Sequence, residues 1–243
     1  YGFYPRPSNG PDYAQFYQSF GGVLQDPETG KLVLDRESMQ EFYQFFVDAV
    51  EAKITRKNHL GTDWGQWYTE VANGKAATWH GGTWHYARYT GKEGNEDFFG
   101  TIEFSLIPSG DGNGRPNTIT HPLVYLVTDQ SDDQDEEIAA QLIKIASGPR
   151  LNSLHAIKSA HLGIGQQQSN IELYANNQWA AEATERLLSA ANAQPNHLGY
   201  GAFSEAMFKG LEASWTGAQS PADAVAELET ELRAKLGDDL IVR

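Results

Sequence analysis

Two tryptophans at the ends of neighbouring elements are the residues best placed to bind a ligand. The segment GTDWGQWYTEVANGKAATWHGGTW, residues 61–84, puts Trp64 at the start of a predicted helix and Trp84 in a loop that leaves a short predicted strand. Ligands of open α/β sheets bind at the rim outside the carboxyl ends of the strands. A flat indole beside backbone amides suits a polar ligand with apolar faces. We therefore expect a carbohydrate site at this rim.

The residues around the two indoles support the same interpretation. Gly82 has no side chain, so the backbone N–H groups of Gly82 and Thr83 can approach a ligand beside Trp84. The alternative for Trp84 is an indole that caps the core, and for Trp64 an indole that covers a surface loop. Asp63 can accept hydrogen bonds from sugar hydroxyls, although capping of the helix that follows it is the more common role of such a residue.

A second candidate position is the start of an aromatic-rich helix near the N-terminus. Asp12 and Tyr13 follow the Pro- and Gly-rich stretch YGFYPRPSNGPD. Asp12 can cap the helix or fix a ligand by accepting two hydroxyl groups, and capping is slightly favoured. The helix itself is predicted by four aromatic residues at helical spacing: Tyr13, Phe16, Tyr17 and Phe20.

Other chemistries lack their sequence signatures. The chain has no cysteine, which excludes disulfides and thiolate catalysis. His80 and His85 are five residues apart across a loop, and neither has a carboxylate at ligand spacing as in an HExxH-like pattern, so no zinc site is expected. The Gly-rich stretch 110–114 is followed by neither a helix nor a Lys-Ser/Thr pair, so it is no phosphate loop. No pair of carboxylates is placed as glycoside hydrolysis requires. We expect no catalytic residue, no metal and no cofactor.

Composition sets further limits. The 243 residues carry a net charge of −14, which argues against nucleic acid or an anionic membrane surface as the partner. Hydrophobic residues make up 40% of the chain, enough for a buried core in one large domain or two lobes. No apolar stretch reaches the length of a membrane span, and the opening Tyr-Gly-Phe suggests a processed or truncated product.

Periodicity predicts a mixed α/β fold dominated by helices. Helix starts are indicated at Asp35, Asp63, Ser131 and the pair Ser220-Pro221. Strands are predicted at 76–79, 101–107 and 123–127, and long helices at 171–191 and 200–215.

The order of these pieces resembles the extracellular solute-binding proteins of ATP-driven sugar importers, the group that includes maltose-binding protein. The more specific part is Asn-Gly-Lys-Ala-Ala at 73–77 followed by Gly-Gly-Thr-Trp at 81–84. The resemblance extends over essentially the whole chain. It implies a type II periplasmic-binding-protein fold, in which two α/β lobes close on a ligand like a hinge, represented here mainly by the C-terminal lobe.

The resemblance also assigns lobes and site residues. It implies that 1–103 belong to the C-terminal lobe, that 104–165 return to the N-terminal lobe, and that 166–243 mostly rejoin the C-terminal lobe. The family's sugar-stacking tryptophan matches Trp84, its aromatic after Thr-Asp matches Trp64, and its first aromatic helix starts at Asp12 and Tyr13. Its late aromatic contact falls near 200–204, where this chain lacks the expected tryptophan and offers Tyr200.

The first strands and helices of the N-terminal lobe have no counterpart in these residues. As a member of this group, the protein is expected to be a monomeric, periplasmic or extracellular receptor, either free or lipid-anchored through the missing N-terminus. It would pass a di- or oligosaccharide to membrane permease subunits. Two alternatives remain: a carbohydrate-active enzyme or accessory module, and a receptor of the same fold for a non-sugar solute. A charged solute would require a cation, and Arg88 is the basic residue nearest the 81–84 loop.

Overall fold

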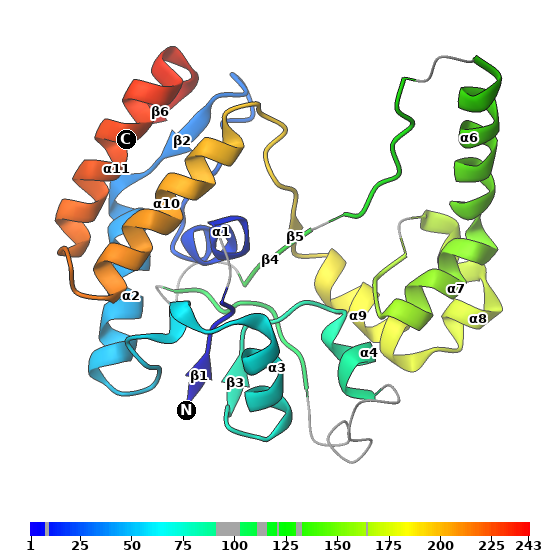
Figure 1. Cartoon of the computed structure of the whole chain (residues 1–243), viewed down its shortest axis with the longest axis horizontal. Helices are drawn as coiled ribbons and strands as arrows, with labels where there is room; N and C mark the ends of the chain where they lie inside the picture. The colour runs from blue at the N-terminus through cyan, green and yellow to red at the C-terminus, as the bar shows by residue number, and fades with distance from the viewer. Residues whose placement is uncertain (8–9, 91–102, 111–115, 121, 130–132, 164) are drawn as a thin grey trace. The chain divides into compact units, whose positions relative to one another are not determined.

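The computed structural model describes residues 1–243 apart from 8–9, 91–102, 111–115, 121, 130–132 and 164. The chain forms two compact units (Figure 1). Unit 1 contains residues 1–81, 105–120 and 190–243, and unit 2 contains residues 82–104 and 121–189. Unit 1 is therefore built from three separate segments of the chain.

Four helices form the body of unit 1: α1 (Gly10–Ser19), α2 (Arg36–Glu51), α10 (Tyr200–Trp215) and α11 (Pro221–Leu236). Helix α10 packs on the other three. The predicted caps are confirmed. The Asp35 carboxylate accepts from the backbone N–H of Ser38, and the Ser220 hydroxyl accepts from that of Asp223 with Pro221 at the first helical position. Each cap satisfies an N–H group that the helix itself leaves without a partner.

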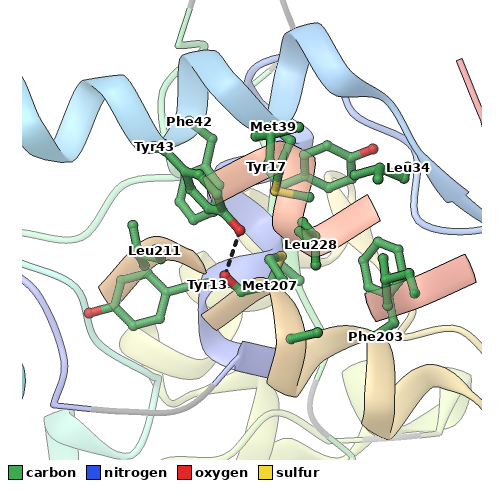
Figure 2. Packing of buried hydrophobic residues seen from close by; sticks show 14 of the residues in the cluster. Tyr13, Tyr17, Leu34, Met39, Phe42, Tyr43, Phe203, Met207, Leu211 and Leu228 are labelled. Carbon is green, nitrogen blue, oxygen red and sulfur yellow. Dashed lines mark hydrogen bonds between the residues drawn. The ribbon is translucent and has the colours of Figure 1, made fainter. Parts of the chain in front are cut away.

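The core of unit 1 lies between these helices. Figure 2 shows Tyr13 of α1, Phe42 of α2 and Phe203 of α10 among its closely packed side chains. The Tyr43 hydroxyl donates to the Met207 carbonyl oxygen at 2.7 Å, so this buried phenol is satisfied without water (Figure 2).

Short parallel strand pairs join distant parts of unit 1. Strand β1 (Phe3–Tyr4) pairs with β3 (Thr78–Trp79), β2 (Leu32–Leu34) with β6 (Leu240–Val242), and β4 (Thr118–Ile119) with β5 (Ala191–Asn192). The 3₁₀ turn η1 (His59–Gly61) and helix α3 (Trp64–Ala72) precede β3, and the 3₁₀ turn η3 (Gly237–Asp239) precedes β6. Asp63 caps α3 by accepting from the Gln66 N–H at 3.0 Å, as predicted.

The described residues of unit 2 form helices joined by irregular segments, and no strand occurs among them. Its helices are α4 (His85–Thr90), α6 (Asp133–Ala146), α7 (Pro149–Ser159), α8 (Glu172–Ala175) and α9 (Gln178–Leu188), with a 3₁₀ turn η2 (Gln166–Asn170) before α8. Ala156, Tyr174 and Ala180 form a small buried cluster that ties α7, α8 and α9 together. Helix α6 buries none of its residues.

Several predicted elements are wrong. Of the strand predicted at 101–107, residues 101–102 lie outside the described part, and 103–106 are irregular, with Ile107 in a single bridge to Asn117. The strand predicted at 123–127 is absent as well, because a strand needs a neighbour and the described residues offer it none. The strand predicted at 76–79 is shorter, and its Thr78 is exposed instead of buried.

Two helix predictions also need correction. Asp12 is the third residue of α1 and therefore does not cap it; its carboxylate pairs with Arg6 instead. The helix predicted at 171–191 divides into α8 and α9, because the first ends at its C-cap Asn176 and the next residue, Asn177, caps the second by accepting from the Ala180 N–H. The predicted start at Ser131 lies outside the described residues.

The unit boundaries differ from the expected segments. The units divide the chain at 81/82, 104/105, 120/121 and 189/190, whereas the expected segments end at 103 and 165; the switch at 104/105 leads from unit 2 into unit 1 and is not the expected passage out of the first segment. Helices α8 and α9 stay in unit 2 because the cluster of Ala156, Tyr174 and Ala180 ties them to α7. The assignment of either unit to a lobe of a whole receptor remains a prediction. Within the described residues, no helix is both long and apolar enough to cross a lipid bilayer.

Candidate functional site

A buried ion pair lies at the start of α1 in unit 1. Arg6 Nη1 is 2.9 Å from Asp12 Oδ1, and both side chains are 9% exposed. Burial lowers the pKa of the Arg6 guanidinium, and the nearby Asp12 carboxylate opposes that shift. The pair is neutral overall, and the attraction between the two charges compensates part of the cost of removing them from water.

Arg6 also contacts Trp64, one of the two predicted indoles. Its guanidinium carbon lies 4.9 Å from the centre of the Trp64 ring, within the range of a cation–π interaction. Trp64 packs against Trp67 and Tyr68 of its own helix, with ring centroids 5.9 and 5.7 Å away. Its side chain remains half-buried, so part of the indole faces outward.

Two tyrosines complete the Arg6 cluster, which we define as Arg6, Asp12, Tyr13, Trp64 and Tyr200. The fully buried Tyr13 donates from its hydroxyl to the Arg6 carbonyl oxygen at 2.6 Å. Burial, followed by the charge of Asp12, raises the pKa of Tyr200 to about 12. The Tyr200 hydroxyl is buried and has no hydrogen-bond partner among the described residues. It is therefore a buried polar group whose hydrogen-bonding capacity no described residue uses.

The other predicted indole, Trp84, belongs to unit 2. It lies within a turn in which the N–H of His85 donates to the Gly82 carbonyl and that of Tyr86 donates to the Thr83 carbonyl. The Trp84 ring stacks on His161 at a centroid distance of 6.0 Å and meets the edge of His85 at 5.4 Å. Like Trp64, it is half-buried.

Gly82 has a packing role that the sequence did not indicate. A Cβ atom at this position would overlap the six-membered ring of Trp84. The space beside Gly82 is thus occupied by the indole itself, and a side chain at this position would force the indole to move. Direct contact of Gly82 and Thr83 with a ligand remains a prediction.

The structure therefore brings together Asp12, Tyr13, Trp64 and Tyr200 in unit 1, and Gly82, Thr83 and Trp84 in unit 2. Asp63 is exposed and occupied in capping α3. Contact of a single ligand with both groups remains a prediction.

Arg6 is the central residue that sequence reasoning missed. It lies in a Pro-rich stretch, and its partners are 6 and 58 residues further along the chain. The available signal was that Arg6 and Asp12 are the charged side chains of residues 1–12 and have opposite signs.

Similarity to known structures identifies the fold. The maltose-bound MalE3 of T. maritima has a TM-score of 0.83 and 21% identity, over 96% of this chain and 60% of its own. MalE of Bdellovibrio bacteriovorus, bound to maltotriose, has a TM-score of 0.78 and 17% identity, over 98% and 60%.

The fold is that of a type II periplasmic binding protein. A further protein with this fold is an ABC transporter solute-binding protein from Agrobacterium radiobacter K84 in complex with ribitol, with a TM-score of 0.70 and 19% identity, over 96% and 59%. The chain thus spans about 60% of the length of these binding proteins. No protein-family model matches the sequence, and no curated protein sequence does.

Proposed function

We propose that this chain is the larger part of a solute-binding receptor of an ATP-driven importer, and that the receptor binds a neutral carbohydrate and delivers it to a membrane permease. The observation that carries the proposal is the type II fold over 96% of the chain, with half-buried indoles at both predicted positions, Trp64 and Trp84. On this proposal the receptor performs no chemistry on its ligand, acts as a monomer, and works in the periplasm or outside the cell.

The Arg6 cluster supports a hydroxyl-rich ligand. Partly exposed indole faces can cover the apolar side of a sugar ring, and the Tyr200 hydroxyl lacks a hydrogen-bond partner in the described part of the chain. A ligand hydroxyl would satisfy that phenol, whose buried position otherwise carries a desolvation cost.

The charge balance of the same cluster favours a neutral ligand over a charged one. Capture of a carboxylate or phosphate needs a cation that is not already neutralised. Arg6 is held by Asp12 at 2.9 Å, and Arg88, the other candidate cation, is exposed. The ribitol complex among the structural neighbours makes a neutral polyol the second candidate class.

The proposal is tested by intrinsic tryptophan fluorescence of the full-length gene product, titrated with maltose, maltotriose, laminaribiose and ribitol. The best ligand should lose about 2 kcal/mol of binding free energy, roughly 30-fold in affinity, when Trp84→Ala or Trp64→Ala removes an indole.

The matched control is Trp179→Ala. Trp179 is another half-buried indole of unit 2, stacked on Tyr86 at 4.6 Å and outside the predicted site. We expect this change to leave the affinity within about twofold. Binding of no sugar or polyol by the full-length protein would refute the proposal, and an unchanged affinity in Trp84→Ala would refute the assignment of that residue.

A further inference from the structure

Beside Trp84 of unit 2 lies His161, a histidine that was not among the predicted ligand-binding residues. The two rings are stacked, with 6.0 Å between their centroids and 21° between their planes. Stacked rings lie about 3.5–4 Å apart, so this centroid distance requires a sideways offset of about 4.5–5 Å. The imidazole therefore borders the indole and does not cover the whole of its face.

Gly82 determines which face of Trp84 a ligand can cover. A Cβ atom on Gly82 would lie 2.1, 2.2 and 2.6 Å from Cζ3, Cη2 and Cε3 of the indole, which are consecutive atoms of its six-membered ring. A point in the plane of the ring and outside its edge cannot be this close to all of them. The Gly82 backbone therefore lies over one face of the indole, and a sugar ring has to stack on the opposite face.

The backbone around His161 is held in place. Helix α7 is followed by Ala160, which is fully buried and adopts a left-handed conformation with φ of 52° and ψ of 34°. Few residues other than glycine adopt this conformation, and such residues are concentrated at ligand-binding sites. Two residues beyond His161, the N–H of Gly163 donates to the Tyr174 hydroxyl at 3.1 Å. This turn thus fixes His161 beside Trp84 before a ligand arrives.

The hydrogen bonds of Ser159 fix the tautomer of His161. The Ser159 hydroxyl donates to the His155 carbonyl oxygen at 2.7 Å, and a hydroxyl has a single proton to donate. Ser159 Oγ therefore accepts from His161 Nδ1, which is 2.8 Å away. In the neutral imidazole the other ring nitrogen, Nε2, is then a hydrogen-bond acceptor. A bond of this kind holds a binding side chain in one orientation.

We propose that His161 is a further ligand-binding residue of the receptor, and that its Nε2 accepts a hydrogen bond from a hydroxyl of the sugar ring that stacks on Trp84. This inference rests on the receptor function proposed above. The equatorial hydroxyls of a pyranose lie close to the plane of its ring, so they extend parallel to the indole on which the ring stacks. An imidazole that borders the indole at an angle of 21° presents its nitrogens in the same layer.

This contact gives the site a directional element. Stacking on an indole accepts any ring with a flat apolar face, whereas a bond to one nitrogen requires a hydroxyl at one position of the sugar. His161 therefore favours a pyranose with an equatorial hydroxyl beside the imidazole over its axial epimer. It also favours such a sugar over an acyclic polyol, which has no ring to stack.

The test titrates the full-length gene product with maltose, maltotriose and laminaribiose and follows the sugar that binds most tightly. His161→Phe keeps an aromatic ring beside Trp84 and removes the nitrogen, so the affinity should fall about tenfold, the effect of one lost hydrogen bond. His161→Gln loses the ring and keeps a hydrogen-bond acceptor, so its affinity should stay within about threefold of that of the unsubstituted protein.

The matched control is His155→Phe. His155 is the neighbouring histidine of α7, exposed and with its ring centroid 6.1 Å from that of His161. We expect this change to leave the affinity within about twofold.

A second measurement needs no sugar. Nitrogen NMR of the imidazoles in the ligand-free full-length protein at alkaline pH reports which nitrogen carries the proton. We expect the proton of His161 on Nδ1, and we expect Ser159→Ala to abolish this preference, because the variant lacks the oxygen that accepts from Nδ1.

Three results would overturn the inference: an unchanged affinity in His161→Phe, an equal loss in His161→Phe and His161→Gln, or a His161 proton on Nε2. If the unsubstituted protein binds sugar and His161→Phe binds it equally well, the proposed function stands and this inference alone fails. If the unsubstituted protein binds no sugar, the proposed function is refuted and His161 loses its assigned ligand with it.

Discussion

The two units differ in how they cover the apolar face of an amphipathic helix. In unit 1, the stripe of Val225, Leu228 and Leu232 along α11 is buried against α10 and α2. In unit 2, the stripe of Ile138, Leu142 and Ile145 along α6 is exposed. Both stripes follow helical spacing. An amphipathic pattern therefore shows which face of a helix needs cover, and the cover itself comes from elsewhere in the sequence.

Strands show the same contrast. The run Leu32–Leu34 is buried because β6, more than 200 residues later, lies alongside it in parallel. The longer apolar run at 123–127 has no such partner among the described residues and stays exposed. Apolar content alone thus does not make a strand; the pairing partner does.

The contrast between the two units is tested most directly by truncating one large side chain in each of them. Phe46 of α2 is fully buried and stacks on Trp215 at 4.7 Å, so Phe46→Ala should cost about 3–5 kcal/mol of unfolding free energy. Leu142→Ala on α6 should change it by less than about 0.5 kcal/mol, because the leucine is already solvated. Urea unfolding followed by circular dichroism measures both, and a similar loss in the two variants would contradict the contrast.

The sequence predicted what is local and missed what is distant. Asp35, Asp63 and Ser220 cap their helices as expected, because a cap is decided within three or four residues. The Arg6 cluster was only partly foreseen, since Asp12, Trp64 and Tyr200 meet there through tertiary packing. The strand at 123–127 was predicted from its side chains, and its absence reflects a partner that no local pattern reveals.

A second test concerns buried charge. Asp12→Ala would leave the guanidinium of Arg6 buried without its carboxylate, which should cost about 3 kcal/mol of unfolding free energy. The counterpart in unit 2 is Glu137 on α6, an exposed carboxylate that accepts from Gln141 at 2.9 Å. Glu137→Ala should cost less than about 0.5 kcal/mol in the same urea experiment. If both changes were equally mild, the Arg6–Asp12 pair would not be the dehydrated contact described here.

A third test uses pH. Burial lowers the pKa of His59 in unit 1 to about 4, from an ordinary value near 6.5. Between these values the unfolded chain binds a proton that the folded chain does not. The contribution of His59 to the unfolding free energy is therefore fully present above about pH 6.5. The unfolding free energy falls by about 2–3 kcal/mol as the pH drops toward 4.

His59→Gln should flatten this part of the pH–stability curve, measured by urea unfolding at half-unit steps. The comparison variant is His155→Gln, which removes one exposed histidine of unit 2. The decisive quantity is the difference between the slopes of the two variants. Equal slopes would mean that burial of His59 contributes nothing to the acid sensitivity of unit 1.

The smallest expected effect concerns unit 2, where Gly82 lies in close contact with the Trp84 ring. Gly82→Ala forces its new Cβ into the Trp84 ring, so the indole must move, at a cost of about 1–2 kcal/mol. Because the displaced indole leaves its position for stacking, sugar affinity should fall about tenfold. Gly61→Ala in unit 1 is the matched control, since no atom lies within 4 Å of its Cβ position. Thermal unfolding and sugar titration of both variants decide the matter: an unchanged affinity in Gly82→Ala would show that the place of the Trp84 indole on the Gly82 backbone is irrelevant to ligand binding.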